Sequence, residues 1–217
     1  MSQLTWSPVG ASVFQHGLDR GVLYIGDDPG IAWSGLISVD VSMTGNERIR
    51  SYFDGIELLE IVKPGNFQAT IKALSSPAEF NECLGEKSFM PGFSLTHQLR
   101  VPFGLSYRTF VGDGSYKIHI IYNATVASSS RANQTVGKQI NPLVYQWELD
   151  ALPEEDVLFE QCIPTAHLVI DSNKVAPEGL ASVESMLYGA GTDEEPISSP
   201  MLLAPNLIWT ALLGPVI

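Results

Sequence analysis

SYFDGIELLEIVKPGNFQATIKAL, residues 51–74, contains two apolar runs separated by turn residues. Asp54-Gly55 between the runs 48–53 and 56–62 predicts a tight hairpin. Strict alternation of apolar and polar residues predicts a half-buried strand over residues 66–74. The apolar positions of that strand are Phe67, Ala69, Ile71 and Ala73. The stretch therefore predicts antiparallel β-ribbon, and it holds no obviously reactive side chain.

The same pattern continues outward in both directions. We expect further strands at 22–25, within 31–43, and at 104–111, 116–123, 140–150 and 166–170. Two short helices are predicted, one of about two turns from Ser76 to Leu84 and one over Pro177–Tyr188, which Gly189 ends. The polar residues 124–138 are typical of a long loop. The sequence thus predicts a mainly β fold, an antiparallel β-sandwich or barrel with one or two short flanking helices.

The domain organisation follows from where this pattern starts and stops. Residues 1–20 are expected to form an N-terminal arm, 21–190 the β-sandwich domain and 191–217 a C-terminal extension. The extension ends in the apolar run LIWTALLGPVI. An exposed run of this kind would favour aggregation, so we expect it to dock on its own domain or on a neighbouring chain.

Composition limits the classes of function. The 217 residues carry 24 Asp and Glu against 12 Lys and Arg, a formal net charge of −12. Such a chain should bind neither nucleic acid nor an anionic membrane, because both interactions depend on Lys and Arg. Charged residues make up only 17%, so part of the surface is expected to be covered by partners. The start MSQLTWSPVG lacks the features of a signal peptide, and no run is long enough to span a membrane.

Motifs for catalysis or metal binding are weak throughout. The histidines His97, His119 and His167 lie in or near predicted strands, and we interpret them as solvated or hydrogen-bonded structural residues, with His119 on a polar strand face. Ser106 lacks the second glycine of a nucleophile elbow. Cys83 and Cys162 are far apart in sequence and are expected to be buried free thiols rather than a disulfide or zinc site. We therefore predict no enzyme activity, cofactor or metal.

Eight segments, in order, resemble major tail proteins, the tail tube subunits of long, non-contractile-tailed phages that infect actinobacteria. The similarity covers roughly residues 19–190. The segments are DRGVLY (19–24), AWSGL (32–36), YFDGI (52–56), PAEFNEC (77–83), FGLSYRT (103–109), KIHIIYNA (117–124), YQWEL (145–149) and PTAHLVIDS (164–172).

This resemblance implies a fold of the phage tail tube type and a structural role in the virion tail, with synthesis in the host cytoplasm. It implies partners as well: copies of the same chain in hexameric rings stacked into a tube, and other tail proteins. Genomic DNA and the tape measure protein would pass through the lumen without specific binding. An acidic lumen would repel phosphate and let DNA slide.

Candidate site residues follow from the strand faces. We expect Asp40, Glu57 and Glu60 to face the lumen, and Tyr52, Phe53, Ile208, Trp209 and Leu212 to contact other subunits. Two alternatives stay open: another tail component of the same fold, such as a distal tail or tail terminator protein, and a carbohydrate-binding β-sandwich module. Copy number would separate the first from a tube subunit, and glycan binding by the monomer would support the second.

Overall fold

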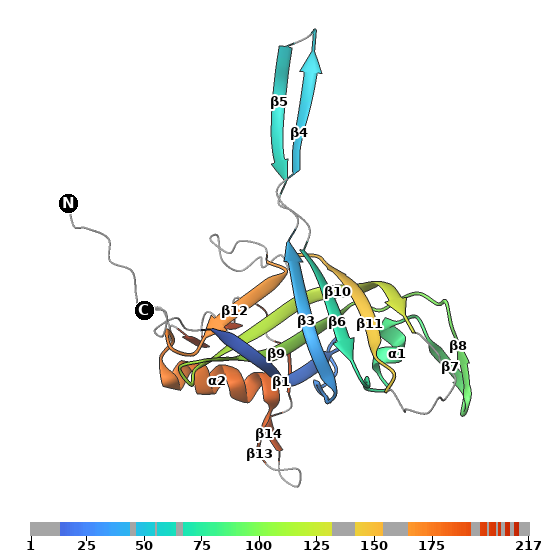
Figure 1. Cartoon of the computed structure of the whole chain (residues 1–217), viewed down its shortest axis with the longest axis vertical. Helices are drawn as coiled ribbons and strands as arrows, with labels where there is room; N and C mark the ends of the chain where they lie inside the picture. The colour runs from blue at the N-terminus through green and yellow to red at the C-terminus, as the bar shows by residue number, and fades with distance from the viewer. Residues whose placement is uncertain are drawn as a thin grey trace, which may run out of the picture.

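A computed structural model describes residues 14–43, 47–54, 56–63, 67–131, 142–153, 165–191, 196–198, 200–202, 204, 207–208 and 211–212. The elements, shown in Figure 1, are β1 (Gln15–Tyr24), β2 (Ile31–Trp33), β3 (Leu36–Met43), β4 (Glu47–Phe53), β5 (Ile56–Lys63), β6 (Phe67–Ala73), α1 (Phe80–Cys83), β7 (Lys87–Met90), β8 (Phe93–Leu95), β9 (Phe103–Val111), β10 (Tyr116–Ser130), β11 (Tyr145–Ala151), β12 (His167–Asp171), α2 (Pro177–Tyr188), β13 (Ala190–Gly191) and β14 (Pro196–Ser198).

The body is an eight-stranded antiparallel sheet with the order β2-β1-β9-β10-β11-β6-β3 and with β12 added on β10. The long strand β10 connects two halves of this sheet. Its residues 117–121 pair with both β9 and β12, and its residues 124–130 pair with β11. Asn123, at a positive φ of 45°, stands at the change of partner. The mainly β, antiparallel fold class is confirmed.

Two apolar cores lie on opposite sides of the sheet, because neighbouring residues of a strand point to opposite faces. One core is built on β6 and β11, whose alternate residues are buried. In it Phe80 of α1 is fully buried and packs against the rings of Trp33, Phe103 and Trp147. The four-residue helix α1 therefore covers one end of this core with its buried side chains.

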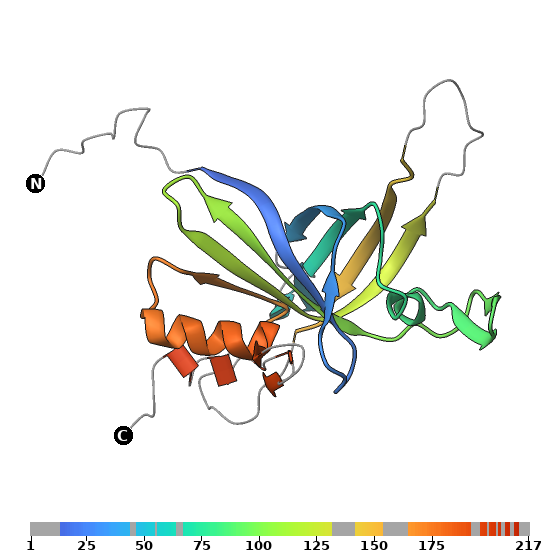
Figure 2. The ribbon, with the colours of Figure 1, turned by 90° about the horizontal axis from the view of Figure 1, so that it is seen from below.

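The second core lies under α2. Figure 2 shows this helix against the half of the sheet that holds β1, β9 and β12. Leu180, Val183 and Leu187 share one face of α2 and pack on alternate residues of β10, Ile118 and Ile120 among them. The hydroxyl of Tyr24 donates to the carbonyl of Leu187 over 2.7 Å and also meets Ser106 Oγ at 3.1 Å, which ties the helix end to the sheet.

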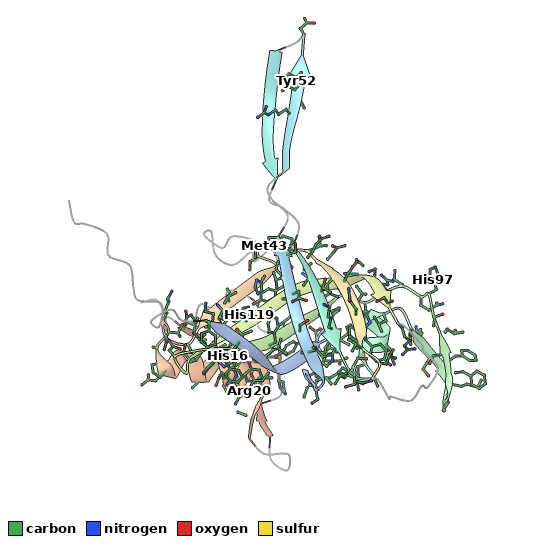
Figure 3. All side chains as sticks on the ribbon, in the orientation of Figure 1. His16, Arg20, Met43, Tyr52, His97 and His119 are labelled. Atoms are coloured by element: carbon green, nitrogen blue, oxygen red, sulfur yellow. The ribbon has the colours of Figure 1, made fainter. Side chains whose placement is uncertain are left out.

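Two hairpins stand away from the body. β4 and β5 pair with each other, as the Asp-Gly turn predicted, and project from the end of the sheet near Met43 (Figure 1; Figure 3). β7 and β8 form a second, shorter hairpin beside α1 that the sequence analysis did not predict.

Three expectations about element boundaries were wrong. Residues 15–20, expected in an N-terminal arm, form the first half of β1 and pair with β9. Residues 124–130, expected in a polar loop, continue β10 and pair with β11, whose hydrogen bonds override the low apolar content. The first helix is α-helical only over Phe80–Cys83, because the amides of Phe80, Asn81 and Glu82 bond to carbonyls three residues back, as in a 3₁₀ turn.

Candidate functional site

The outer face of β3, β6, β11 and the second half of β10 is polar along its whole width. The inward positions of these strands fill the first core, so the alternate positions face away from it. We call this surface the polar sheet face. Its residues are Ser38, Asp40 and Ser42 of β3, Gln68, Thr70 and Lys72 of β6, Gln146, Glu148 and Asp150 of β11, and Thr125 and Ser128 of β10.

Carboxylates dominate the charge of the polar sheet face. Asp40 lies 3.8 Å from Lys72, and both side chains are substantially exposed. Asp150 accepts a 2.8 Å hydrogen bond from Gln68 Nε2, and Glu148 accepts a 2.7 Å bond from Ser128 Oγ. Three carboxylates against one ammonium make the surface net negative, and neutral donors hold two of the acids in place. Such a surface repels phosphate and offers no apolar patch for adhesion.

The predicted lumen acids do not share one surface. Asp40 lies on the polar sheet face, whereas Glu57 and Glu60 belong to the projecting hairpin. Register places position 57 opposite Tyr52 and position 60 opposite Arg50. The two positions therefore lie on the projecting ribbon and not on the sheet that carries Asp40.

Sequence analysis did not select Glu148 and Asp150. The signal is present in YQWELD, where Tyr145, Trp147 and Leu149 alternate with polar residues. The residues between them had to face the other way. What the pattern did not show is that β6 pairs with β11 and with β3, which brings these acids onto the same face as Asp40.

The predicted contact residues differ in what they offer a partner. Tyr52 is 61% exposed on the projecting hairpin. Ile208 is only 2% exposed and packs in the second core, where Leu212 also packs. The apolar C-terminus was expected to dock either on its own domain or on a neighbouring chain. Ile208 and Leu212 dock on their own domain. The side chain of Phe53, and Trp209 as a whole, lie outside the described residues.

The edge of β3 is unpaired in the sheet as described. β3 is the last strand in the sheet order and is eight residues long, whereas β2 at the opposite end has three. An unpaired edge of this length exposes a row of amides and carbonyls that a second chain can pair with.

His119 corrects the expectation of a polar strand face. Its side chain lies on the face of the sheet that carries the first core. There its ring stacks on Tyr107 at 4.7 Å and on His167 at 5.4 Å between ring centroids, and His167 in turn packs on Phe67. Its Nδ1 lies 3.2 Å from His167 Nε2, and its Nε2 lies 3.0 Å from Thr109 Oγ1. Burial, reinforced by His167, lowers the pKa of His119 to about 4.

We call the stacked rings of Tyr107, His119, His167 and Phe67 the histidine stack. Its chemistry gives little support to catalysis. Both nitrogens of His119 already have partners, which satisfies the one donor and one acceptor of a neutral imidazole. Burial raises the pKa of the Cys83 thiol to about 12, so it stays protonated at neutral pH and is a poor nucleophile. Within the described part of the chain, no group of three or more His, Cys, Asp or Glu could hold a metal ion. Cys162 is outside the described residues.

Comparisons with known proteins give remote structural similarities only. No family model and no curated protein matches the chain. A chain from the sheath–tube complex of an extracellular contractile injection system, PVC, shares 12% identity at a TM-score of 0.35, covering 70% of this chain and 88% of that one. A chain from the anti-feeding prophage baseplate shares 10% identity at a TM-score of 0.37, covering 78% and 97%. Across the residues that the structure describes, no helix is long and apolar enough to cross a bilayer.

Proposed function

We propose that this chain is a structural subunit of a phage-type tail tube, whose copies form rings that stack around a bore. The observation that carries this proposal is the polar sheet face. Four strands present a continuous surface with no apolar side chain at its assigned positions and three acids to one lysine. As the wall of a bore, it would let a polyanion pass without adhering.

The edges of the sheet support assembly into rings. A ring joins different patches of successive copies, so each copy needs two complementary surfaces rather than one self-complementary surface. The unpaired edge of β3 is one such surface. The resemblance to major tail proteins supports a ring of six copies and an assembly in the virion tail beside other tail proteins. Genomic DNA and the tape measure protein would then occupy the lumen without specific binding.

The β4–β5 hairpin supports contact beyond one subunit. In the described sheet pairing, these strands pair only with each other, and an isolated two-stranded hairpin is marginally stable in water. Tyr52 stays largely exposed on it. If the neighbouring ring of subunits covered the hairpin, it would bury the Tyr52 side chain and stabilise both strands. Phe53 and Trp209 keep their predicted role at subunit contacts in this proposal.

Negative-stain electron microscopy of the purified, full-length chain tests the proposal directly. We expect rings or tubes of constant bore at high protein concentration. A chain that stays monomeric at every concentration, and also in virion extracts, would exclude the assembly. Abundance in the virion then separates a tube subunit from a tail terminator or distal tail protein, since a tube contains many rings and a terminator forms one.

A further inference from the structure

The first core is open along a seam between β1 and β3. The two strands approach at Gly21, where the side chain of Leu36 occupies the space a Cβ would need. Further along they diverge and leave a hollow of about 430 Å³. Its walls are apolar at Leu18 of β1 and at Ile37, Val39 and Val41 of β3, and its floor includes Tyr107 and His119. Its lining also holds the polar side chains of Gln15, Ser38, Thr109 and His167. Ile37 is 47% exposed there, which is unusual for a core-facing position.

Both rims of the seam present unpaired backbone within the described sheet. β3 is the terminal strand of the sheet order. On the β1 rim, β2 covers only Gly21 to Leu23, so residues 15–20 pair with β9 alone. Apolar walls between two open edges are the arrangement in which an extended segment of another chain can add to a sheet.

The β7–β8 hairpin complements the seam, because it projects from the body and carries apolar side chains on one side. Register places Met90, Phe93 and Leu95 on one side, with Lys87 at its base opposite Leu95, and Ser88 with Ser94 on the other. Phe89, at the register shift, is 74% exposed and Phe93 is 64% exposed. Water therefore covers an apolar side that a stable two-stranded hairpin would normally bury.

The hairpin and the seam cannot meet within one chain. Figure 3 places His97, just after β8, at the far side of the body from His119 on the floor of the seam. A projecting hairpin at one end and a hollow away from it on the body make a heterologous pair, the kind of contact from which closed rings are built. A second copy of this chain supplies both surfaces at the same concentration.

We propose that the β7–β8 hairpin of one copy inserts its apolar side into the seam between β1 and β3 of the next copy. This inference deepens the proposed function, on which it rests, by naming the contact that links neighbours. Phe93 would pack on the Tyr107–His119 floor, since aromatic rings pair well in offset or edge geometry. A hollow of this volume lies in the range that accommodates compact ligands, and it can take one or two bulky side chains.

A disruption experiment measures the energy of the contact. The double variant Phe89→Asp/Phe93→Asp places charge at the two exposed aromatic rings of the hairpin, while Leu152→Asp makes the same kind of change at a residue that is 70% exposed elsewhere. We expect the double variant to weaken self-association at least about tenfold by sedimentation velocity, as loss of aromatic anchors does in other interfaces. The control variant should associate as wild type does. Equal association of the double variant and wild type would overturn the inference.

A cross-linking experiment tests the geometry. In a Cys162→Ser background, where the remaining native thiol Cys83 is buried, Phe93→Cys protein is mixed with Ile37→Cys protein under mild oxidation. We expect disulfide-linked heterodimers, and far fewer when Ile37→Cys is replaced by Glu178→Cys on α2. Equal yields with both partners, or none with Ile37→Cys, would exclude the proposed insertion.

The two proposals fail in different ways. Rings without the Phe93–Ile37 cross-link would leave the tube function standing and reject this contact. A cross-linked chain that never forms rings or tubes would keep the contact and reject the tube. Binding of an unrelated protein at the seam, with no self-association of the free chain, would also reject the contact.

Discussion

His119 couples the stability of the fold to pH. In the folded chain its pKa is lowered to about 4, first because the ring is partly buried and then because His167 lies beside it, whereas the ordinary value is 6.5. Between these two values the unfolded chain binds more protons than the folded one. The free energy of unfolding should therefore be fully retained above pH 6.5 and fall as the pH drops toward 4.

The variant His119→Gln tests this coupling. We expect roughly one fewer proton to be taken up on unfolding near pH 5, measured from urea titrations at a series of pH values. Burial lowers the pKa of His167 too, so a smaller pH dependence should remain. His97→Gln, at an exposed position outside the histidine stack, shows whether loss of any histidine has the same effect on the pH dependence. An unchanged pH dependence in His119→Gln would contradict the assignment.

Tyr24 links the sheet to the end of α2 through one hydroxyl. That hydroxyl donates to the Leu187 carbonyl and meets Ser106, and burial raises its pKa well above the usual value. Removing it in Tyr24→Phe leaves buried polar partners unpaired, so we expect a loss of about 1–3 kcal/mol in unfolding free energy by urea denaturation. Tyr52→Phe, on an exposed ring, should stay within about 0.5 kcal/mol. Equal stability of both variants would place the hydrogen bonds of Tyr24 in doubt.

At the scale of elements, the C-terminal segment belongs to the body. Besides Ile208 in the core, the amide of Met201 donates to the Met186 carbonyl over 2.9 Å, and the amide of Gly30 donates to Pro200 over 2.8 Å. We expect Ile208→Ala to cost about 2–5 kcal/mol through cavity formation. Its neighbour Leu207 is 51% exposed, and Leu207→Ala should cost less than about 0.5 kcal/mol. Thermal and urea unfolding of both variants checks the contrast. Similar costs would mean that this segment does not dock as described.

The β4–β5 hairpin should behave in the opposite way. Replacing residues 47–63 by a short Gly-Ser linker removes strands that pair only with each other in the described sheet, so the melting temperature of the body should change little. Assembly should change strongly, from tubes to single rings or smaller species, by electron microscopy and sedimentation. Normal tubes from this variant would remove the hairpin from the stacking contact.

At the scale of the whole molecule, charge on the polar sheet face should decide whether DNA adheres to the tube. The triple variant Asp40→Lys, Glu148→Lys, Asp150→Lys reverses the three acids, all at solvent-facing positions. We expect tubes of normal shape that retain duplex DNA in a salt-dependent manner, because lysines displace counterions from phosphate. In the phage, DNA ejection should slow. Pelleting tubes with labelled DNA at low and high salt measures the effect.

A matched variant separates the position of the charge from its amount. Glu79→Lys, Glu82→Lys, Glu178→Lys makes the same change in net charge at exposed residues away from the polar sheet face. This control should not retain DNA inside the tube. Equal retention by both variants would show that net charge alone controls adhesion, and that the polar sheet face does not line the bore.

The sequence by itself determined the period-two strands, the Asp-Gly hairpin and α2, because these depend on local alternation and on turn and helix-end residues. The expectation that Cys83 is buried is met as well. Such features are decided within about ten residues, where backbone geometry fixes which side chains share a face.

Only the tertiary structure decided which strands are neighbours. Pairing of β6 with β11 and β3 joined Asp40, Glu148 and Asp150 on one surface, and pairing of β10 with β12 placed His119 against His167, 48 residues away. The polar residues 124–130 became strand for the same reason, since β11 offered them hydrogen bonds. Alternation reveals that a strand has two faces, but long-range register determines what each face meets.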